Sequence, residues 1–152
     1  MVDVILSPTR GGTASYPNQD RAIAIAKERG SELLFLYITN VQFLDHTPLA
    51  KTVDLEEEMD EMGEFLLTMA VERAEKEGVN ARMEVRRGLF RDVISEMISE
   101  FDITCVVLGS SSGGTGVIKE EYIHDLLETV SSETGVEFIV LDKGNVVRTY
   151  KS

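Results

Sequence analysis

Residues 103–116 have the sequence ITCVVLGSSSGGTG, an apolar run followed by a segment of glycine, serine and threonine. A short β-branched run that ends at glycine predicts a strand buried on both faces. The segment after it predicts a turn that only residues with small side chains can make, and a helical pattern begins soon afterwards. Ligands of open α/β sheets bind outside the carboxyl ends of the strands, so we expect a binding site at this turn.

The rest of the chain repeats this order of strand, turn and helix. Apolar runs predict strands at 2–6, 33–38, 81–87, 103–109 and 136–141, and periodic segments predict helices at 17–29, 54–77, 90–101 and 118–134. Residues 39–52 lack periodicity and are expected to form a loop. Alternating strands and helices predict an α/β fold with a five-stranded parallel sheet, helices on both faces and right-handed crossovers. We expect a single domain over residues 1–152.

The longest predicted helix begins at Asp54 and ends before Gly78. Its apolar residues recur at alternating spacings of four and three, which predicts a buried stripe, with alanines extending the same face. The stripe is Leu55, Met59, Met62, Leu66 and Met69, extended by Ala70 and Ala74. Acidic residues crowd the first turns, where they favour the positive end of the helix dipole and indicate a solvated face.

Composition excludes several classes of function. The formal net charge of −12 disfavours nucleic acid and anionic membranes as partners. No apolar run is long enough to cross a bilayer, and the first residues lack the pattern of a signal peptide. Cys105 is the only cysteine, so no internal disulfide can form. These features predict a cytoplasmic protein, with Cys105 as a small buried core residue.

Two glycine-rich turns are candidates for chemistry, one after the 2–6 strand and one after the 103–109 strand. The second offers many backbone N–H groups ahead of a helix, and its hydroxyls add donors for a phosphate or another anion. It matches neither the P-loop nor the dinucleotide-binding fingerprint. A flexible loop without ligand remains the alternative. The candidate residues here are Gly109, Ser110, Ser111, Ser112, Gly113, Gly114, Thr115 and Gly116.

Three stretches carry a resemblance to a known family. They are ILSPT at 5–9, RRGLFRDVISEMISEFDITCVVLGSSSGG at 86–114 and VSSETGVEFIVL at 130–141. Over nearly its whole length the chain resembles a universal stress protein domain. The resemblance implies a flavodoxin-like sandwich, similar to the adenine-nucleotide alpha-hydrolase fold, with strand order 3-2-1-4-5. It also implies a homodimer in which the edges of the 136–141 strands meet, with residues 142–152 as a tail at the dimer edge.

The resemblance also suggests ATP as a ligand, but this chain departs from the pattern of ATP-binding members. Gly109 matches their first loop glycine, whereas the spacing to Gly113 is one residue longer. Arg10 stands where binders usually have Asp, and His124-Asp125 stands near the position of their later Gly-Ser or Gly-Thr. Arginine cannot accept hydrogen bonds from a nucleoside, although it can hold a phosphate.

The remaining candidate site residues come from the ends of two other strands. Pro8, Thr9 and Arg10 follow the first strand, and Ile38 ends the second and can offer backbone contacts to a base. No pair of histidines has metal-ligand spacing, so we expect no metal site. No residue is a convincing base for hydrolysis, so weak ATPase activity is the most that enzyme chemistry would allow.

The leading hypothesis is therefore a regulatory domain that senses ATP, AMP or another phosphate ligand. The alternative is a dimeric interaction module without a nucleotide, which acts through its dimer surface and acidic helix.

Overall fold

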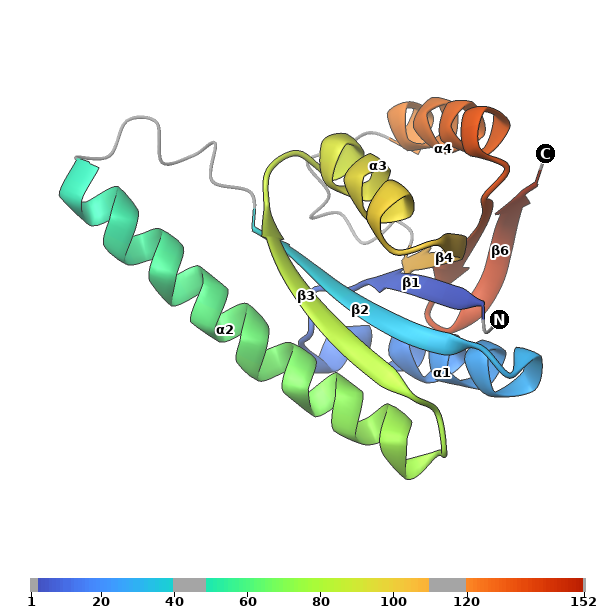
Figure 1. Ribbon diagram of the computed structural model, residues 1–152, viewed down its shortest axis with the longest axis horizontal. Coiled ribbons are helices and arrows are strands. Elements are labelled where there is room, and N and C mark those ends of the chain that lie inside the picture. The colour runs from blue at the N-terminus through green and yellow to red at the C-terminus, as the bar shows by residue number, and fades with distance from the viewer. Residues whose placement is uncertain (1–2, 40–48, 110–119, 152) are drawn as a thin grey trace.

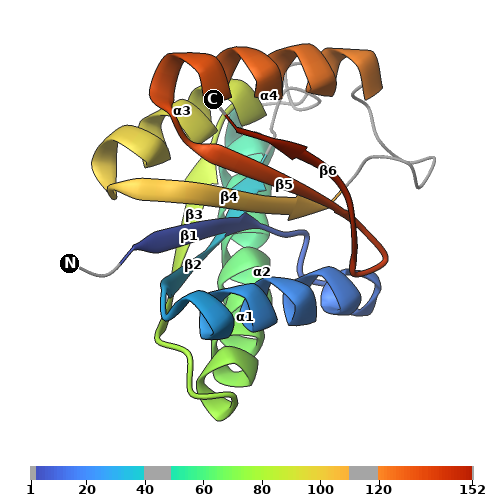
Figure 2. The same ribbon diagram turned by 90° about the vertical axis from the view of Figure 1, so that its right-hand side faces the viewer.

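The computed structural model describes residues 3–39, 49–109 and 120–151, except for the side chains of 49–56 and 120–123. Within these ranges the chain forms one six-stranded sheet with helices on both faces (Figures 1 and 2). The strands are β1 (Val4–Pro8), β2 (Glu32–Thr39), β3 (Ala81–Arg87), β4 (Ile103–Gly109), β5 (Glu137–Asp142) and β6 (Asn145–Tyr150). The helices are α1 (Tyr16–Arg29), α2 (Leu49–Lys76), α3 (Phe90–Glu100) and α4 (Glu120–Thr134), with a 3₁₀ turn η1 (Thr13–Ser15) before α1.

The strand order is β3-β2-β1-β4-β5-β6, which confirms the predicted 3-2-1-4-5 order and adds one strand. Neighbouring strands from β3 to β5 are parallel, and β6 is antiparallel to β5. The chain moves outward in one direction through β2 and β3 and then in the other through β4 and β5. The direction of winding therefore reverses between β1 and β4.

The strand β6 corrects one expectation about the dimer edge. The resemblance implied that β5 edges meet between two copies, which requires β5 to be an open edge. Instead, β6 of the same chain pairs with β5 from Phe138↔Tyr150 to Asp142↔Asn145. The tail does form a strand, and that strand covers the β5 edge. The free edges of the described sheet are therefore β3 and β6.

Alternating side chains divide the interior into two cores, one on each face of the sheet. Leu34, Leu36 and Val106 point to the face covered by α3 and α4, where Phe138 is fully buried. Leu33 and Phe35 point to the opposite face, covered by α1 and α2. Burial on both faces explains why the central strands are nearly continuous in apolar residues.

The helix α2 differs from its prediction in both its start and its buried face. It begins at Leu49 instead of Asp54. The predicted stripe is wrong in its angular position, because Met62 is 60% exposed and Leu66 and Met69 are only partly buried. The buried face consists of Gly63, Leu67, Ala70 and Ala74, so the two alanines are buried as predicted, whereas Gly63 and Leu67 were not part of the predicted stripe.

Small side chains explain this rotation of α2. A Cβ placed on Gly63 would lie 2.7 Å from the Tyr37 ring, so the helix backbone approaches β2 more closely than any larger residue would allow. A prediction from hydrophobic periodicity gives methionine and leucine more weight than glycine and alanine, because their side chains are more hydrophobic. The helix nevertheless buries the small residues, since they permit this close contact.

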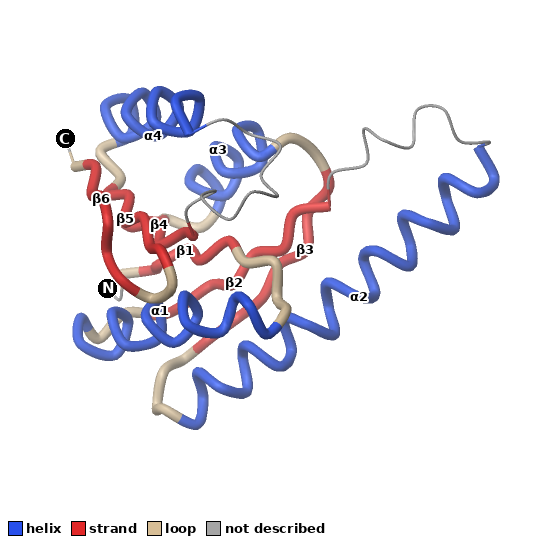
Figure 3. The backbone as a smooth tube through the Cα atoms, turned by 180° about the vertical axis from the view of Figure 1, so that it is seen from behind, coloured by secondary structure: helices blue, strands red, loops and turns tan. Residues whose placement is uncertain are grey.

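The helix α2 also extends beyond the sheet. Asp60 lies beside the last residues of β2 and β3, because its carboxylate contacts Thr39 and accepts a 3.0 Å hydrogen bond from Arg87 Nε. Residues 49–59 therefore project past the strand ends by about 16 Å, as Figures 1 and 3 show from opposite sides. No helix in the described part of the chain is long and apolar enough to cross a membrane.

We expect Gly63→Ala to destabilise the protein. In an open helical position this change stabilises by about 1 kcal/mol. Here the new methyl meets the Tyr37 ring, and overpacking of this kind costs about 1–3 kcal/mol. Urea unfolding followed by circular dichroism measures the difference.

The matched control is Gly12→Ala. Gly12 has φ −77° and open space around an added Cβ, so its change in stability should stay within about 0.5 kcal/mol. A stabilised Gly63→Ala protein would show that the helix lies further from β2 than described.

Candidate functional site

The carboxyl ends of β1 and β4 lie side by side where the winding reverses. Leu6 pairs with Val106, so the chain leaves both strands a few residues later at the same edge of the sheet. In open α/β sheets this reversal opens a crevice between neighbouring loops. The two predicted turns therefore start from adjacent strands, and the residues around Pro8 and Gly109 form the floor of the candidate site.

The turn after β1 is held by a buried polar side chain. The backbone N–H of Thr9 donates to the Leu36 carbonyl at 2.9 Å, which continues the β1–β2 pairing beyond Pro8. The Thr9 hydroxyl oxygen accepts hydrogen bonds from Gln19 Nε2 at 2.9 Å and from the Gly11 backbone N–H at 3.2 Å. Gln19 is only 1% exposed. The Thr9 side chain therefore fixes the turn.

Gln19 also connects this turn to α2. Its Oε1 accepts a 2.6 Å hydrogen bond from Arg73, whose guanidinium also pairs with Asp20 and lies 4.0 Å from the centre of the Tyr16 ring. Because Gln19 is an amide, it can accept from Arg73 and donate to Thr9 at once. The sequence analysis missed Gln19, since a glutamine inside a helix carries no motif.

The turn also touches α2 directly. Gly11 has φ +82°, and a Cβ there would lie 2.5 Å from the Leu66 Cβ. Both the backbone conformation and the contact exclude larger residues at this position. Arg10, the residue before it, is exposed at the mouth of the turn.

At the end of β4, Asn18 lies over Gly109. Its Oδ1 accepts a 2.8 Å hydrogen bond from the Gly144 backbone N–H in the β5–β6 turn. This bond orients the amide so that Nδ2 faces Gly109, where an added Cβ would be only 2.7 Å away. Asn18 thus places an N–H donor at the crevice. Nothing in the sequence pattern singled out this residue, because its role depends on contacts between distant segments.

Ile38 presents its backbone to the same crevice. The Thr39 carbonyl accepts a hydrogen bond from the Gly88 N–H on the β3 side. The Leu36 carbonyl accepts one from the Thr9 N–H on the β1 side. Successive residues of a parallel strand alternate sides, so the backbone groups of Ile38 face the β1 side. Since β1 has ended by this level, those groups lie beyond the β1–β2 pairing at the edge where the candidate site is placed.

The rest of the predicted loop, from Ser110 to Gly116, lies outside the described residues. Among the described candidates, Pro8, Thr9, Arg10, Ile38 and Gly109 come together at one edge of the sheet.

His124 and Asp125 lie in the second turn of α4, and the His124 imidazole contacts β6. Its Nδ1 is 2.6 Å from the Tyr150 hydroxyl and 3.1 Å from the Arg148 guanidinium. Because a guanidinium only donates, Nδ1 acts as the acceptor. On the other side, Nε2 lies 3.4 Å from Glu128. The imidazole therefore links α4 to β6.

His124, Asp125 and Glu128 also place one ligand atom each within 4.8 Å of one another. Arg148 adds a positive charge beside them, which opposes the binding of a cation.

Cys105 is buried in the core next to the Arg29–Glu137 ion pair, whose Nη1–Oε1 distance is 2.8 Å. Burial, together with the Glu137 charge, raises the pKa of the Cys105 thiol to about 12. The group is thus a neutral thiol at physiological pH, which fits the predicted core role and not that of a nucleophile.

The architecture is that of a doubly wound α/β domain whose winding reverses between β1 and β4. A family model described as "Universal stress protein family" matches residues 1–120, and the chain belongs to this family. None of the curated proteins matches the sequence.

Several solved structures share the fold. Universal stress protein UspA from Lactobacillus plantarum has a TM-score of 0.72 at 18% identity, over 91% of this chain and 97% of that one. The universal stress protein from Archaeoglobus fulgidus in complex with dAMP has a TM-score of 0.57 at 15% identity, over 92% and 97%. An Arabidopsis thaliana family protein with AMP bound has a TM-score of 0.58 at 16% identity, over 92% and 91%.

We expect Cys105 to be unreactive in the folded protein. At pH 8 a thiol with a pKa of about 12 is almost wholly protonated, and it is 1% exposed. Ellman's reagent should therefore modify native protein at least about a hundredfold more slowly than protein unfolded in guanidinium chloride. Fast reaction of the native protein would place Cys105 at the surface.

Proposed function

We propose that the chain is a regulatory domain that binds an adenine nucleotide at the crevice between β1 and β4. The observation that carries the proposal is the meeting of Ile38 backbone groups, the Asn18 amide and the Gly109 turn at the point where winding reverses. Relatives of the same fold are described with AMP and with dAMP bound, which supports a nucleotide over other phosphate compounds.

The two halves of the ligand would meet different groups. The base is expected near Ile38, because a peptide group offers both a donor and an acceptor without needing a particular side chain. The phosphate is expected near Gly109, where Asn18 Nδ2 supplies an N–H donor. Arg10 would add a charge-assisted bond to the same phosphate. With a net charge of −12, these local donors must hold the anion, since the overall field repels it.

AMP fits this proposal better than ATP. The Asp that binders usually carry after the first strand is replaced by Arg10, and the later Gly-Ser position falls in the α4 helix at His124-Asp125. The first departure affects nucleoside contacts that AMP and ATP share, so it does not distinguish them. The second affects phosphate contacts, and a single phosphate needs fewer of these than three phosphates do. ATP remains the second ligand to test, and turnover is not part of the proposal.

We expect AMP to bind more weakly when Arg10 is replaced by Ala, by about tenfold, or about 1.4 kcal/mol. Adenosine, which lacks the phosphate, should be affected much less. Arg21→Ala is the matched control, because it removes the same charge from an exposed position on α1. Titration calorimetry with AMP, ATP and adenosine measures these differences, and chemical-shift changes near Ile38 and Gly109 locate the site.

The absence of both heat and shift changes with all three compounds would contradict the nucleotide proposal. Equal losses in Arg10→Ala and Arg21→Ala would show that only the overall charge matters.

We further propose that two copies associate along β6. Val146 and Val147 on this edge strand are 44% and 56% exposed, and an apolar open edge favours strand pairing. Val147→Lys places like charges at such an edge, so it should shift a dimer towards the monomer in light scattering. A wild-type protein that stays monomeric at about 100 µM, far above the Kd of a specific interface, would contradict this proposal.

A further inference from the structure

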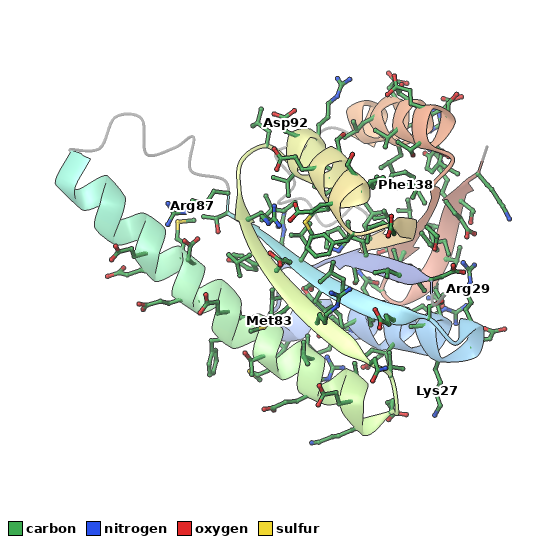
Figure 4. The ribbon with its side chains drawn as sticks, viewed as in Figure 1. Lys27, Arg29, Met83, Arg87, Asp92 and Phe138 are labelled. Atoms are coloured by element: carbon green, nitrogen blue, oxygen red, sulfur yellow. The ribbon has the colours of Figure 1, made fainter. Side chains whose placement is uncertain are left out.

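The outer face of α2 carries apolar side chains that are exposed in the part of the chain that the structure describes. Among the described residues six large apolar side chains are exposed, and three of them lie on or beside this helix. Met62 and Phe65 are 60% and 66% exposed, and Met83 of β3 is 40% exposed. Figure 4 shows Met83 beside α2, and the Thr68 hydroxyl lies 3.6 Å from its sulfur.

These side chains form one continuous surface. Residues three and four apart on a helix are neighbours, so Phe65 adjoins Met62, Thr68 and Met69. Thr68 in turn contacts Met83, which extends the surface onto the edge strand. We call the surface formed by Met62, Phe65, Met69 and Met83 the α2 face. Methionine side chains are flexible and adapt to a partner's shape, and an exposed phenylalanine is a frequent anchor at interfaces.

Acidic side chains of α2 flank the α2 face along the helix, and we call them its acidic rim. Glu58 precedes Met62 by one turn, Glu61 precedes Phe65 by one turn, and Glu72 follows Met69 by three residues; all three carboxylates are exposed. No lysine or arginine occurs between Glu57 and Glu72. The surface is therefore apolar at its centre and negative around it.

We propose that the α2 face binds a basic amphipathic helix of another protein. An apolar stripe on that helix would cover Phe65 and Met62, and its lysines or arginines would pair with Glu58 and Glu61. The acidic residues of the rim favour a positively charged partner over the other candidates. A second copy of the chain would bring a second acidic rim against the first, and an anionic membrane would be repelled for the same reason.

The position of the α2 face leaves room for such a partner. Asp60 marks the level at which β2 and β3 end. Met62 and Phe65 follow it closely, so they lie at the end of the sheet beside the part of α2 that projects beyond it. The surface is built on a rigid helix whose opposite side is fixed against β2 through Gly63 and Tyr37. The proposal is independent of the nucleotide crevice, since it uses none of the residues placed there.

The test uses a fluorescein-labelled helical peptide of leucine and lysine, about 18 residues long, with leucines on one face. Fluorescence anisotropy should show binding to the wild-type protein that weakens at high salt. Met62→Ser combined with Phe65→Ser should weaken it at least about tenfold, because the apolar anchors are lost. Glu58→Gln combined with Glu61→Gln should weaken it severalfold and reduce its salt dependence. In a peptide of equal charge the leucines are replaced by serine, and this peptide should bind at least about tenfold more weakly.

The matched control is Leu89→Ser, which removes an exposed apolar side chain just before α3 and should leave peptide binding unchanged. Circular dichroism confirms that each variant is folded, and amide chemical shifts should change along residues 57–69. Equal binding by the serine double variant, or by the peptide without leucine, would overturn the proposal. A dimer that Met62→Ser and Phe65→Ser convert to monomer would also overturn it, because the occupant would then be a second copy.

Discussion

The pairing of β1 with both β2 and β4 is the constraint on which the rest of the structure depends. Because β1 has neighbours on both edges and helices on both faces, its apolar side chains supply both cores at once. The connections from β1 through β2 to β3 contain α1 and α2 and cover one face, whereas those from β3 through β4 to β5 contain α3 and α4 and cover the other. This reversal brings the carboxyl ends of β1 and β4 together without any special residue, and the turns after the strands then decide what can bind there.

Much of this architecture could be predicted from the sequence, since it follows from local patterns. The strand positions and the α1 end at Gly30, where φ is +66°, agree with apolar runs and a glycine in the expected place. The strand order was implied by the family resemblance and agrees as well. The angular position of α2 could not be predicted in the same way. Hydrophobic periodicity favoured Met62, whereas the close approach of Gly63 to Tyr37 determines which face is buried. That contact joins residues from different elements, so no local pattern contains it.

The candidate site shows the same limit. Pro8, Ile38 and Gly109 could be placed at one edge because strand ends are visible in the sequence. Asn18 and Gln19 could not, as each acts through a hydrogen bond to a distant segment. The buried Gln19 amide joins the β1 turn to Arg73 of α2, and it has no substitute that could both donate and accept in the same geometry.

The hydrogen bond between Gly144 and Asn18 has a consequence for the end of the chain. It joins the hairpin that carries the last strand to the side chain lying over Gly109. A shortened protein that stops at Asp142 would lose this bond, and the asparagine amide would be free to rotate away from the crevice. Residues far along the chain from Gly109 thus help to shape the end of β4, so the C-terminal hairpin contributes to the candidate site as well as to the sheet.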